Sequence, residues 1–133
     1  MFAQRLAKRI CVKCKVETTA NPAIIAEVFG PAGLPAGFRC WKGQGCEDCS
    51  GRGTRGRVAV VEYMPASREV RRAISRELPL DDVRETALQA GLVTMRDAAL
   101  AHVANGVISF DELPQLVPPE RLAPEQRHAL AAG

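Results

Sequence analysis

The clearest hydrophobic pattern in this sequence is a continuous apolar run near its middle. Val58-Ala59-Val60-Val61 follows Gly56-Arg57 and leads into Tyr63. Because its apolar residues are consecutive rather than alternate, the run is typical of a strand that is buried on both faces. No second run of this kind stands out. The pattern therefore predicts one apolar strand that lacks a partner within the chain and tends to associate with another chain or domain.

Short helices are predicted on both sides of this strand. One is expected to start at Asn21-Pro22 and to stop at Gly30, since proline suits the first helical turn and glycine the end. After the strand, Ser67 can cap a helix that carries Val70 and Ile74 four positions apart. The pattern thus changes from strand to helix near residue 65.

Two further helices are predicted over residues 80–106. The first ends at Gly91, and the second is capped by Thr94 and ends at Gly106. Their apolar stripes are Leu80, Val83, Ala87 and Leu88 in the first, and Met95, Ala99 and Val103 in the second. Each helix therefore has one face suited to a core.

The C-terminal part of the sequence predicts one more helix and then a tail. Ser109-Phe110-Asp111-Glu112 has the form of a capping box, with Glu three residues after Ser. Pro114 follows almost at once, so this helix is expected to be short or bent. Residues 118–133 begin with two prolines and are expected to form a disordered tail.

Eight of the eleven glycines lie between Gly30 and Gly56, in a stretch too rich in glycine for regular structure. Four cysteines flank or occupy this stretch as two pairs, Cys11/Cys14 and Cys46/Cys49. Two residues between paired cysteines allow both sulfur atoms of a tight turn to face one ion, and two such turns complete a tetrahedral site. The spacing predicts a structural Zn²⁺ bound by these four thiolates, since a closed shell has no position for a reacting water.

Other interpretations of the cysteines remain open. Four unligated buried cysteines are one, and a redox dithiol is another, although neither pair lies in a thioredoxin-like context. The fifth cysteine, Cys40, is expected to be a small, half-buried loop residue or a substitute ligand. Trp41 is expected to pack against the metal-binding turns. His102 and His128 have no ligand-like neighbours, so both are expected to be surface or packing residues.

Composition and charge narrow the function classes. The chain has 133 residues, 47% hydrophobic and 25% charged, and no apolar run near the roughly 18–20 residues that span a bilayer. With no secretory signal at its start, it is expected to be soluble and intracellular.

The net charge of +3 would fall to +1 with a four-thiolate zinc site. The basic residues near the cysteines are expected to offset the site's negative charge. They are Lys13, Lys15, Arg52, Arg55 and Arg57.

A cluster of basic residues is typical of two binding roles. The first, nucleic-acid binding, is not expected here, because only Phe38 and Trp41 could stack on bases in this region. The second, docking of an acidic protein partner, stays open. No Gly-x-x-x-x-Gly-Lys-Ser/Thr phosphate loop occurs in the sequence, so the chain is expected neither to bind nor to hydrolyse ATP.

The order of these motifs resembles that of a known family. Ala3-Gln4-Arg5-Leu6, Cys11-x-x-Cys14, Gly45-Cys46-x-x-Cys49, Gly51-x-Gly53 and Gly56-Arg57 with Glu62 resemble the C-terminal region of the type II secretion and type IV pilus assembly ATPases. Residues 91–96, Gly106 and residues 109–112 are similar to that family's closing helices. The resemblance runs from about residue 3 to residue 117. Three positions depart from the family pattern: Thr54, Ala98-Ala99 and Pro114.

The resemblance implies a small α+β fold with four parts. These are a tetracysteine zinc-binding subdomain (1–57), a strand that returns to a RecA-like sheet (58–64), a helical subdomain (65–117) and the tail (118–133). The zinc ligands carry over to Cys11, Cys14, Cys46 and Cys49. The family's catalytic boxes lie upstream of this region, so the chain is expected to be a fragment or a truncated product.

The resemblance also implies a function. The parent would be a hexameric, cytoplasmic motor, peripheral at the inner membrane, that converts ATP hydrolysis into pilus or pseudopilus extension. This chain would be its non-catalytic part, which docks to the upstream ATPase domain, neighbouring subunits and an inner-membrane platform protein. The alternative is a stand-alone zinc-ribbon adaptor that binds protein or nucleic acid, including a DnaJ-like one, since Cys46-x-x-Cys49-x-Gly51-x-Gly53 matches one repeat of those chaperones.

Overall fold

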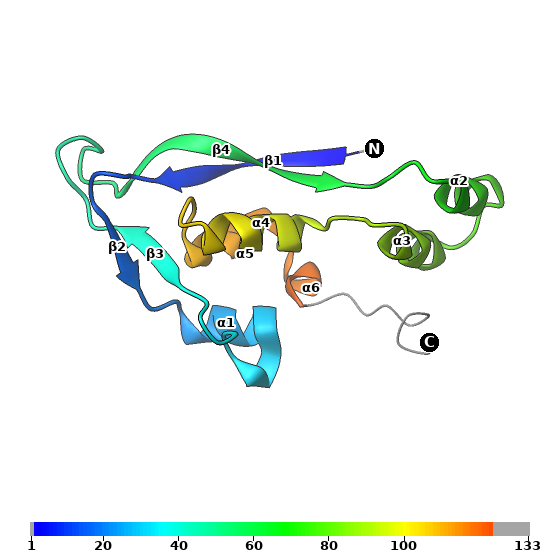
Figure 1. The fold of residues 1–133 in the computed structure, drawn as a ribbon, viewed down its shortest axis with the longest axis horizontal. Helices are drawn as coiled ribbons and strands as arrows, with labels where there is room; N and C mark the ends of the chain where they lie inside the picture. The colour runs from blue at the N-terminus through cyan, green and yellow to red at the C-terminus, as the bar shows by residue number, and fades with distance from the viewer. Residues whose placement is uncertain (1, 124–133) are drawn as a thin grey trace.

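The computed structural model describes residues 2–123. Two long antiparallel strands, β1 (Phe2–Ile10) and β4 (Thr54–Tyr63), pair with each other. In their register Arg5 lies opposite Val60 and Ala7 opposite Val58, and a bulge interrupts β1 between Lys8 and Ile10. The two strands form a ribbon along one side of the molecule (Figure 1).

Two expectations for the apolar run are therefore wrong. The run is a strand, but it has a partner in this chain, because β1 forms the antiparallel ladder of backbone hydrogen bonds with it. It is also not buried on both faces within the described chain. Val60 is fully buried, whereas Val61 and Tyr63 are exposed on the other side of the ribbon. The strand thus alternates between core and outer face despite its continuous apolar sequence.

A second, smaller antiparallel sheet joins β2 (Lys15–Thr18) to β3 (Cys40–Gly43). Between them lie α1 (Pro22–Phe29) and the 3₁₀ turn η1 (Gly30–Ala32). The helix predicted here is confirmed with its caps: the Asn21 side chain accepts a hydrogen bond from the N–H of Ala23, and Gly30 ends the helix with a φ of 70°.

The three helices predicted after the strand are confirmed as α2 (Arg68–Ser75), α3 (Leu80–Gln89) and α4 (Met95–Ala104). Ser67 caps α2 by accepting from the N–H of Val70, and Thr94 caps α4 by accepting from the N–H of Asp97. Gly91 has a positive φ just after α3, as helix-ending glycines commonly do.

The C-terminal elements are the 3₁₀ turn η2 (Phe110–Glu112) and two short helices, α5 (Leu113–Leu116) and α6 (Pro119–Leu122). Ser109 accepts from the N–H of Asp111, but the Glu112 carboxylate accepts from the N–H of Lys8 on β1, 3.4 Å away. Glu112 therefore does not complete the predicted capping box, and its carboxylate links this turn to the ribbon instead. The predicted shortness of the helix is confirmed.

The segment expected to be a disordered tail is partly structured. Pro119 starts α6, where its missing N–H costs no hydrogen bond, and Leu122 is only 1% exposed. The tail interpretation is therefore wrong for residues 118–123. Residues 124–133, including His128, lie outside the described residues.

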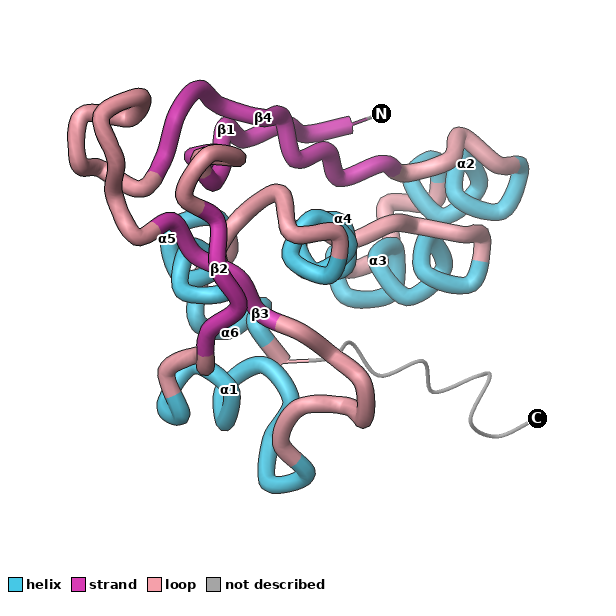
Figure 2. Tube along the Cα trace, turned by 60° about the vertical axis from the view of Figure 1, so that its left-hand side comes forward, coloured by secondary structure: helices cyan, strands magenta, loops and turns pink. Residues whose placement is uncertain are grey.

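The buried residues form two clusters. The main core takes residues from both halves of the chain. It consists of Ala7, Ala20, Val28, Cys40, Val60, Met95, Ala99, Val103, Ile108, Phe110, Leu113, Leu116, Val117 and Leu122. The small core lies between α2 and α3 and consists of Val70, Ala87, Leu88 and Leu92. Figures 1 and 2 show α2 and α3 beside the far end of β4, away from α1 and the β2–β3 sheet. The predicted small α+β class is confirmed.

Candidate metal centre

The two Cys-x-x-Cys turns meet at one end of the ribbon, where β1 passes into β2 and β3 into β4 (Figure 1). Their four sulfur atoms lie within 4.8 Å of one another. The Cys11–Cys46 and Cys46–Cys49 Sγ atoms are 3.7 Å apart, and those of Cys14 and Cys49 are 3.9 Å apart. All four predicted ligands are thus brought together, and the group could hold a metal ion.

These distances test which chemistry the cysteines fit. A tetrahedral ion with metal–sulfur bonds of about 2.3 Å separates its sulfur ligands by about 3.8 Å. A disulfide would bring two sulfur atoms to about 2.05 Å. These three spacings match edges of the tetrahedron, the remaining sulfur pairs lie within 4.8 Å, and all five cysteines are free thiols. The donor set is soft and closed, which suits Zn²⁺ or an iron–sulfur centre rather than a hard cation.

Backbone N–H groups point at two of the sulfur atoms. Gly45 donates to Cys14 Sγ over 3.3 Å, and both Cys46 and Gly53 donate to Cys49 Sγ over 3.2 Å. Such donors stabilise a thiolate, because they hydrogen-bond its negative charge. The turns are therefore arranged for sulfur in its metal-binding form.

The glycines of this region allow the chain segments before and after the second Cys-x-x-Cys turn to pass each other at close range. A Cβ on Gly43 would overlap the carbonyl of Gly53, and one on Gly45 would lie 2.8 Å from the carbonyl oxygen of Gly51. The N–H of Cys11 donates to the carbonyl of Gly53 over 3.0 Å, which joins the first turn to the second. The glycine-rich sequence around the second pair is thus a close-packed crossing of two chain segments rather than a loose loop.

The pKa values of two of the thiols are shifted in opposite directions from their usual value. Burial opposes ionisation of Cys49, but the N–H groups of Cys46 and Gly53 outweigh it and lower the pKa of that thiol to about 6. Burial raises the pKa of Cys14 to about 11, and the single N–H of Gly45 only partly offsets this. The N–H donors therefore favour the thiolate form at Cys49, whereas burial disfavours it at Cys14, and metal binding requires both thiols without their protons.

The other residues singled out in the sequence lie outside the cluster. Cys40 is buried in the main core, more fully than expected, and burial raises its pKa. The Lys15 ammonium lies 5.2 Å from the centre of the Trp41 ring, so this cation contacts the indole. His102 is half-buried on α4.

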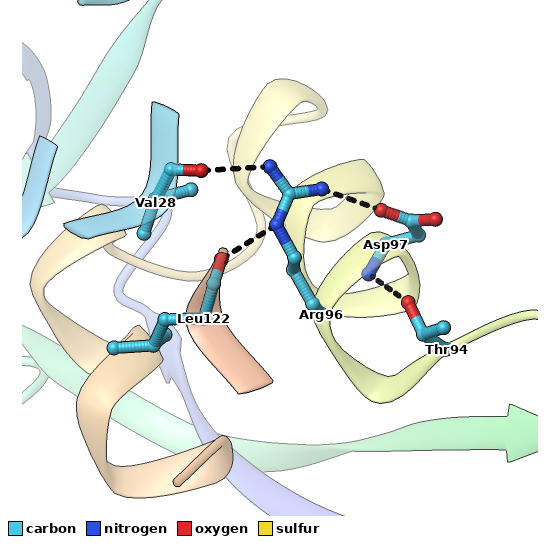
Figure 3. A network of polar contacts seen from close by, with 5 residues as sticks. All are labelled: Val28, Thr94, Arg96, Asp97 and Leu122. Atoms are coloured by element: carbon cyan, nitrogen blue, oxygen red, sulfur yellow. Dashed lines mark hydrogen bonds and ion pairs between the residues drawn. The ribbon is translucent and has the colours of Figure 1, made fainter. Parts of the chain in front are cut away.

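One residue that sequence analysis missed links the metal-binding half to the helices. Arg96 on α4 is only 9% exposed (Figure 3). Its guanidinium donates to the carbonyls of Leu122 and Val28 over 2.7 and 2.9 Å and to the Asp97 carboxylate over 2.7 Å. It also lies 5.7 Å from the centre of the Phe29 ring.

The two backbone acceptors explain why a charged residue is buried there. Val28 and Leu122 lie in the last turns of α1 and α6, where carbonyls have no partner within their own helix. Arg96 satisfies both helix ends at once and joins α1, α4 and α6. A sequence signal for this role is absent, because the acceptors are backbone atoms distant in the chain.

Within residues 2–123 no helix has the length and apolar character needed to cross a membrane.

Comparison with known proteins gives one family and several relatives. The family described as "Type II/IV secretion system protein" matches residues 1–115. The type IV pilus assembly ATPase PilB of Thermus thermophilus is 32% identical over 113 residues, which are 85% of this chain and 13% of the relative. PilB of Myxococcus xanthus is 30% identical over 123 residues, 91% of this chain and 22% of the relative. The type II secretion system protein HxcR of Pseudomonas aeruginosa is 27% identical over 113 residues, 85% and 20% respectively.

The chain therefore spans less than a quarter of the length of each of these relatives. The family match covers both cysteine pairs, the β1–β4 ribbon and helices α2 to α4. By this match, which extends over most of its length, the chain belongs to the type II/IV secretion system protein family.

Proposed function

We propose that Cys11, Cys14, Cys46 and Cys49 hold one structural Zn²⁺. The observation that carries this proposal is the group of four sulfur atoms within 4.8 Å of one another, three of whose spacings match a tetrahedron, with three N–H donors aimed at two of them. When bound, the ion would supply a cross-link between chain segments that few apolar side chains hold together. A four-sulfur shell leaves it no open position for water, so its role is non-catalytic.

We further propose that the chain is the non-catalytic, zinc-binding portion of a hexameric secretion or pilus-assembly motor. Support comes from the family match and from relatives whose names describe them as pilus assembly ATPases or secretion system proteins. ATP binding and hydrolysis would belong to parts of such a protein that the match does not cover. The motor would work in the cytoplasm, peripheral to the inner membrane.

In this proposal the chain acts by docking to the ATPase domain, to neighbouring subunits and to an inner-membrane platform protein. Several large apolar side chains exposed near the end of the ribbon support a contact role. They are Tyr63, Ile74, Leu78, Leu80 and Val93. Such side chains are usually covered when they gather in one region of a protein.

Metal analysis of the purified chain tests the first proposal. One zinc per chain is expected, together with a thermal transition that moves to lower temperature when a chelator removes the ion. Iron in place of zinc, no metal, or a transition that chelation leaves unchanged would contradict it.

A chimaera tests the docking role. The segment of Myxococcus xanthus PilB that matches this chain is replaced by it, and piliation is measured in a strain that lacks the native protein. We expect restored pili, loss of pili with Cys46→Ser, and retention with Cys40→Ala, a cysteine outside the cluster. A Cys46→Ser chimaera that makes pili normally, or a parent chimaera that forms no hexamers, would contradict the role.

A further inference from the structure

A cavity of about 560 Å³ opens beside the second Cys-x-x-Cys turn. Four cationic side chains line it, from β1, from the turn and from the start of β4: Lys8, Arg52, Arg55 and Arg57. The hydroxyl-bearing residues Ser50 and Thr54 also contribute to its wall. Among the described residues the lining contains one carboxylate, that of Asp48, so the side chains of the cavity carry a net positive charge.

The four cations have no acidic partners within the described chain. None of the ion pairs among residues 2–123 involves them. Lys8 and Arg57 also lie directly opposite each other in the β1–β4 register, where two like charges repel. The fold therefore keeps a set of unpaired cations side by side at one place, and an anion between them would relieve the repulsion.

The metal cluster accounts for only part of this charge. Four thiolates around a divalent ion carry two negative charges, and Asp48 adds one. The four cations exceed this total by one. The N–H groups of Cys46 and Gly53 already satisfy Cys49, the ligand that borders the cavity. Positive charge thus remains available to a ligand from solution.

We propose that this cavity binds the phosphate groups of a small polyanion. Three guanidinium groups match phosphate oxygens through paired N–H donors, and hydroxyls can donate to the same oxygens. Among the described residues, no aromatic ring lines the cavity, so none of them offers a surface on which a nucleotide base could stack. The same lining residues include no large apolar side chain for an acyl chain. The ligand is therefore an inorganic polyphosphate or the exposed phosphate of a lipid headgroup.

Binding of inorganic pyrophosphate to the zinc-loaded full chain, measured by titration calorimetry, tests the site. We expect saturable binding that weakens as salt rises, because the cations are exposed. Arg55→Gln should weaken it about tenfold, the effect of losing one charged hydrogen-bonding group. Arg39→Gln, an equal charge change at an exposed position outside the cavity, should leave it nearly unchanged. Both variants should keep their zinc.

Three further results decide the outcome. Pyrophosphate-sensitive binding to phosphatidylglycerol vesicles, with none to phosphatidylcholine vesicles, identifies a lipid headgroup as the source of the phosphate. Pyrophosphate binding without vesicle binding identifies a free anion. No binding of either, equal weakening by Arg39→Gln and Arg55→Gln, or tighter binding of a hexaglutamate peptide than of pyrophosphate would each overturn the proposal.

Discussion

The two ends of the β1–β4 ribbon are stabilised in different ways. At one end, the two Cys-x-x-Cys turns bring their four sulfur atoms together, and the segment between them returns through α1 to the main core. At the other end, α2 and α3 pack against each other around the four residues of the small core. The helical end is therefore stabilised by a small apolar core, and the metal end by the four cysteines and the ion that they would bind.

This difference shows where each end derives its stability. The two metal-binding turns have few apolar side chains, and a bound ion would replace the missing burial. At the helical end, Ser67 caps α2 and four residues form the small core. Ile74, Leu78 and Leu80 remain exposed around a cavity of about 560 Å³. A change at the metal end should therefore act on a large part of the molecule, and a change at the helical end should act locally.

The largest effect is expected from the loss of one metal ligand. Cys46→Ser removes a thiolate from the four-sulfur group, so zinc content should fall well below one ion per chain. Metal binding contributes about 10–16 kcal/mol in zinc-finger peptides, so the two metal-binding turns should unfold. Hydrogen exchange should become fast in β2, β3 and α1, while α2 and α3 stay partly protected.

Cys40→Ala is the matched control for this substitution. It removes a buried thiol that lies outside the cluster, so zinc should remain at one ion per chain with only a modest loss of stability. Equal loss of zinc in both variants would show that the four-cysteine assignment is wrong.

The next largest effect is expected at Arg96. Arg96→Met keeps much of the apolar stem but leaves the carbonyls of Val28 and Leu122 without their donor. Each unsatisfied buried acceptor costs about 1–3 kcal/mol, so the free energy of unfolding should fall by about 3 kcal/mol. Faster exchange in α1 and α6 would be the local signature. Arg71→Met on the exposed side of α2 should change stability by less than about 0.5 kcal/mol.

Arg96 also illustrates which parts of the structure the sequence does not encode locally. The cysteine pairs, α1 and the caps at Ser67 and Thr94 were predictable, because each depends on a few adjacent residues. The burial of Arg96 depends instead on two carbonyls far away in the chain. No local pattern carries that information.

Strand β1 was not predicted for a different reason. Its sequence is rich in charge, and a bulge between Lys8 and Ile10 breaks the alternation, so among residues 3–10 only Ala7 and Ile10 are buried. Leu6, whose side chain is as large as that of Ile10, is 56% exposed. The apolar pattern that indicates a strand therefore lies in β4 and not in β1. For α6 a signal was present, since Pro119 follows a typical preference for the first helical position.

A matched pair of substitutions compares the two cores directly. Val103→Ala in the main core and Val70→Ala in the small core remove the same atoms from nearly fully buried sites. Each should cost about 2 kcal/mol where it acts. Val103→Ala should lower the temperature of the global transition, whereas Val70→Ala should mainly speed hydrogen exchange in α2 and α3. A global effect of the same size from both would mean that the molecule unfolds as one unit.

The smallest effect on stability is expected at Leu80, the first residue of α3. Its side chain is 75% exposed on the rim of the apolar cavity between the helices and the ribbon. Leu80→Gln removes almost no buried surface, so the free energy of unfolding should change by less than about 0.5 kcal/mol. The exposed apolar surface should decrease, which sedimentation at several concentrations and binding of a hydrophobic dye both report. We expect less self-association and less dye bound than in the parent chain.

The matched control is Leu88→Gln on the same helix, which places an amide in the small core, where Leu88 is 2% exposed. It should destabilise α2 and α3 and increase dye binding, the opposite of the change at Leu80. A loss of more than about 1 kcal/mol from Leu80→Gln would show that this side chain packs within the fold. An unchanged sedimentation profile together with unchanged dye binding would show that the rim of this cavity is not a contact surface. The docking role of the helical end would then lose its support, while the metal end and its four cysteines would be unaffected.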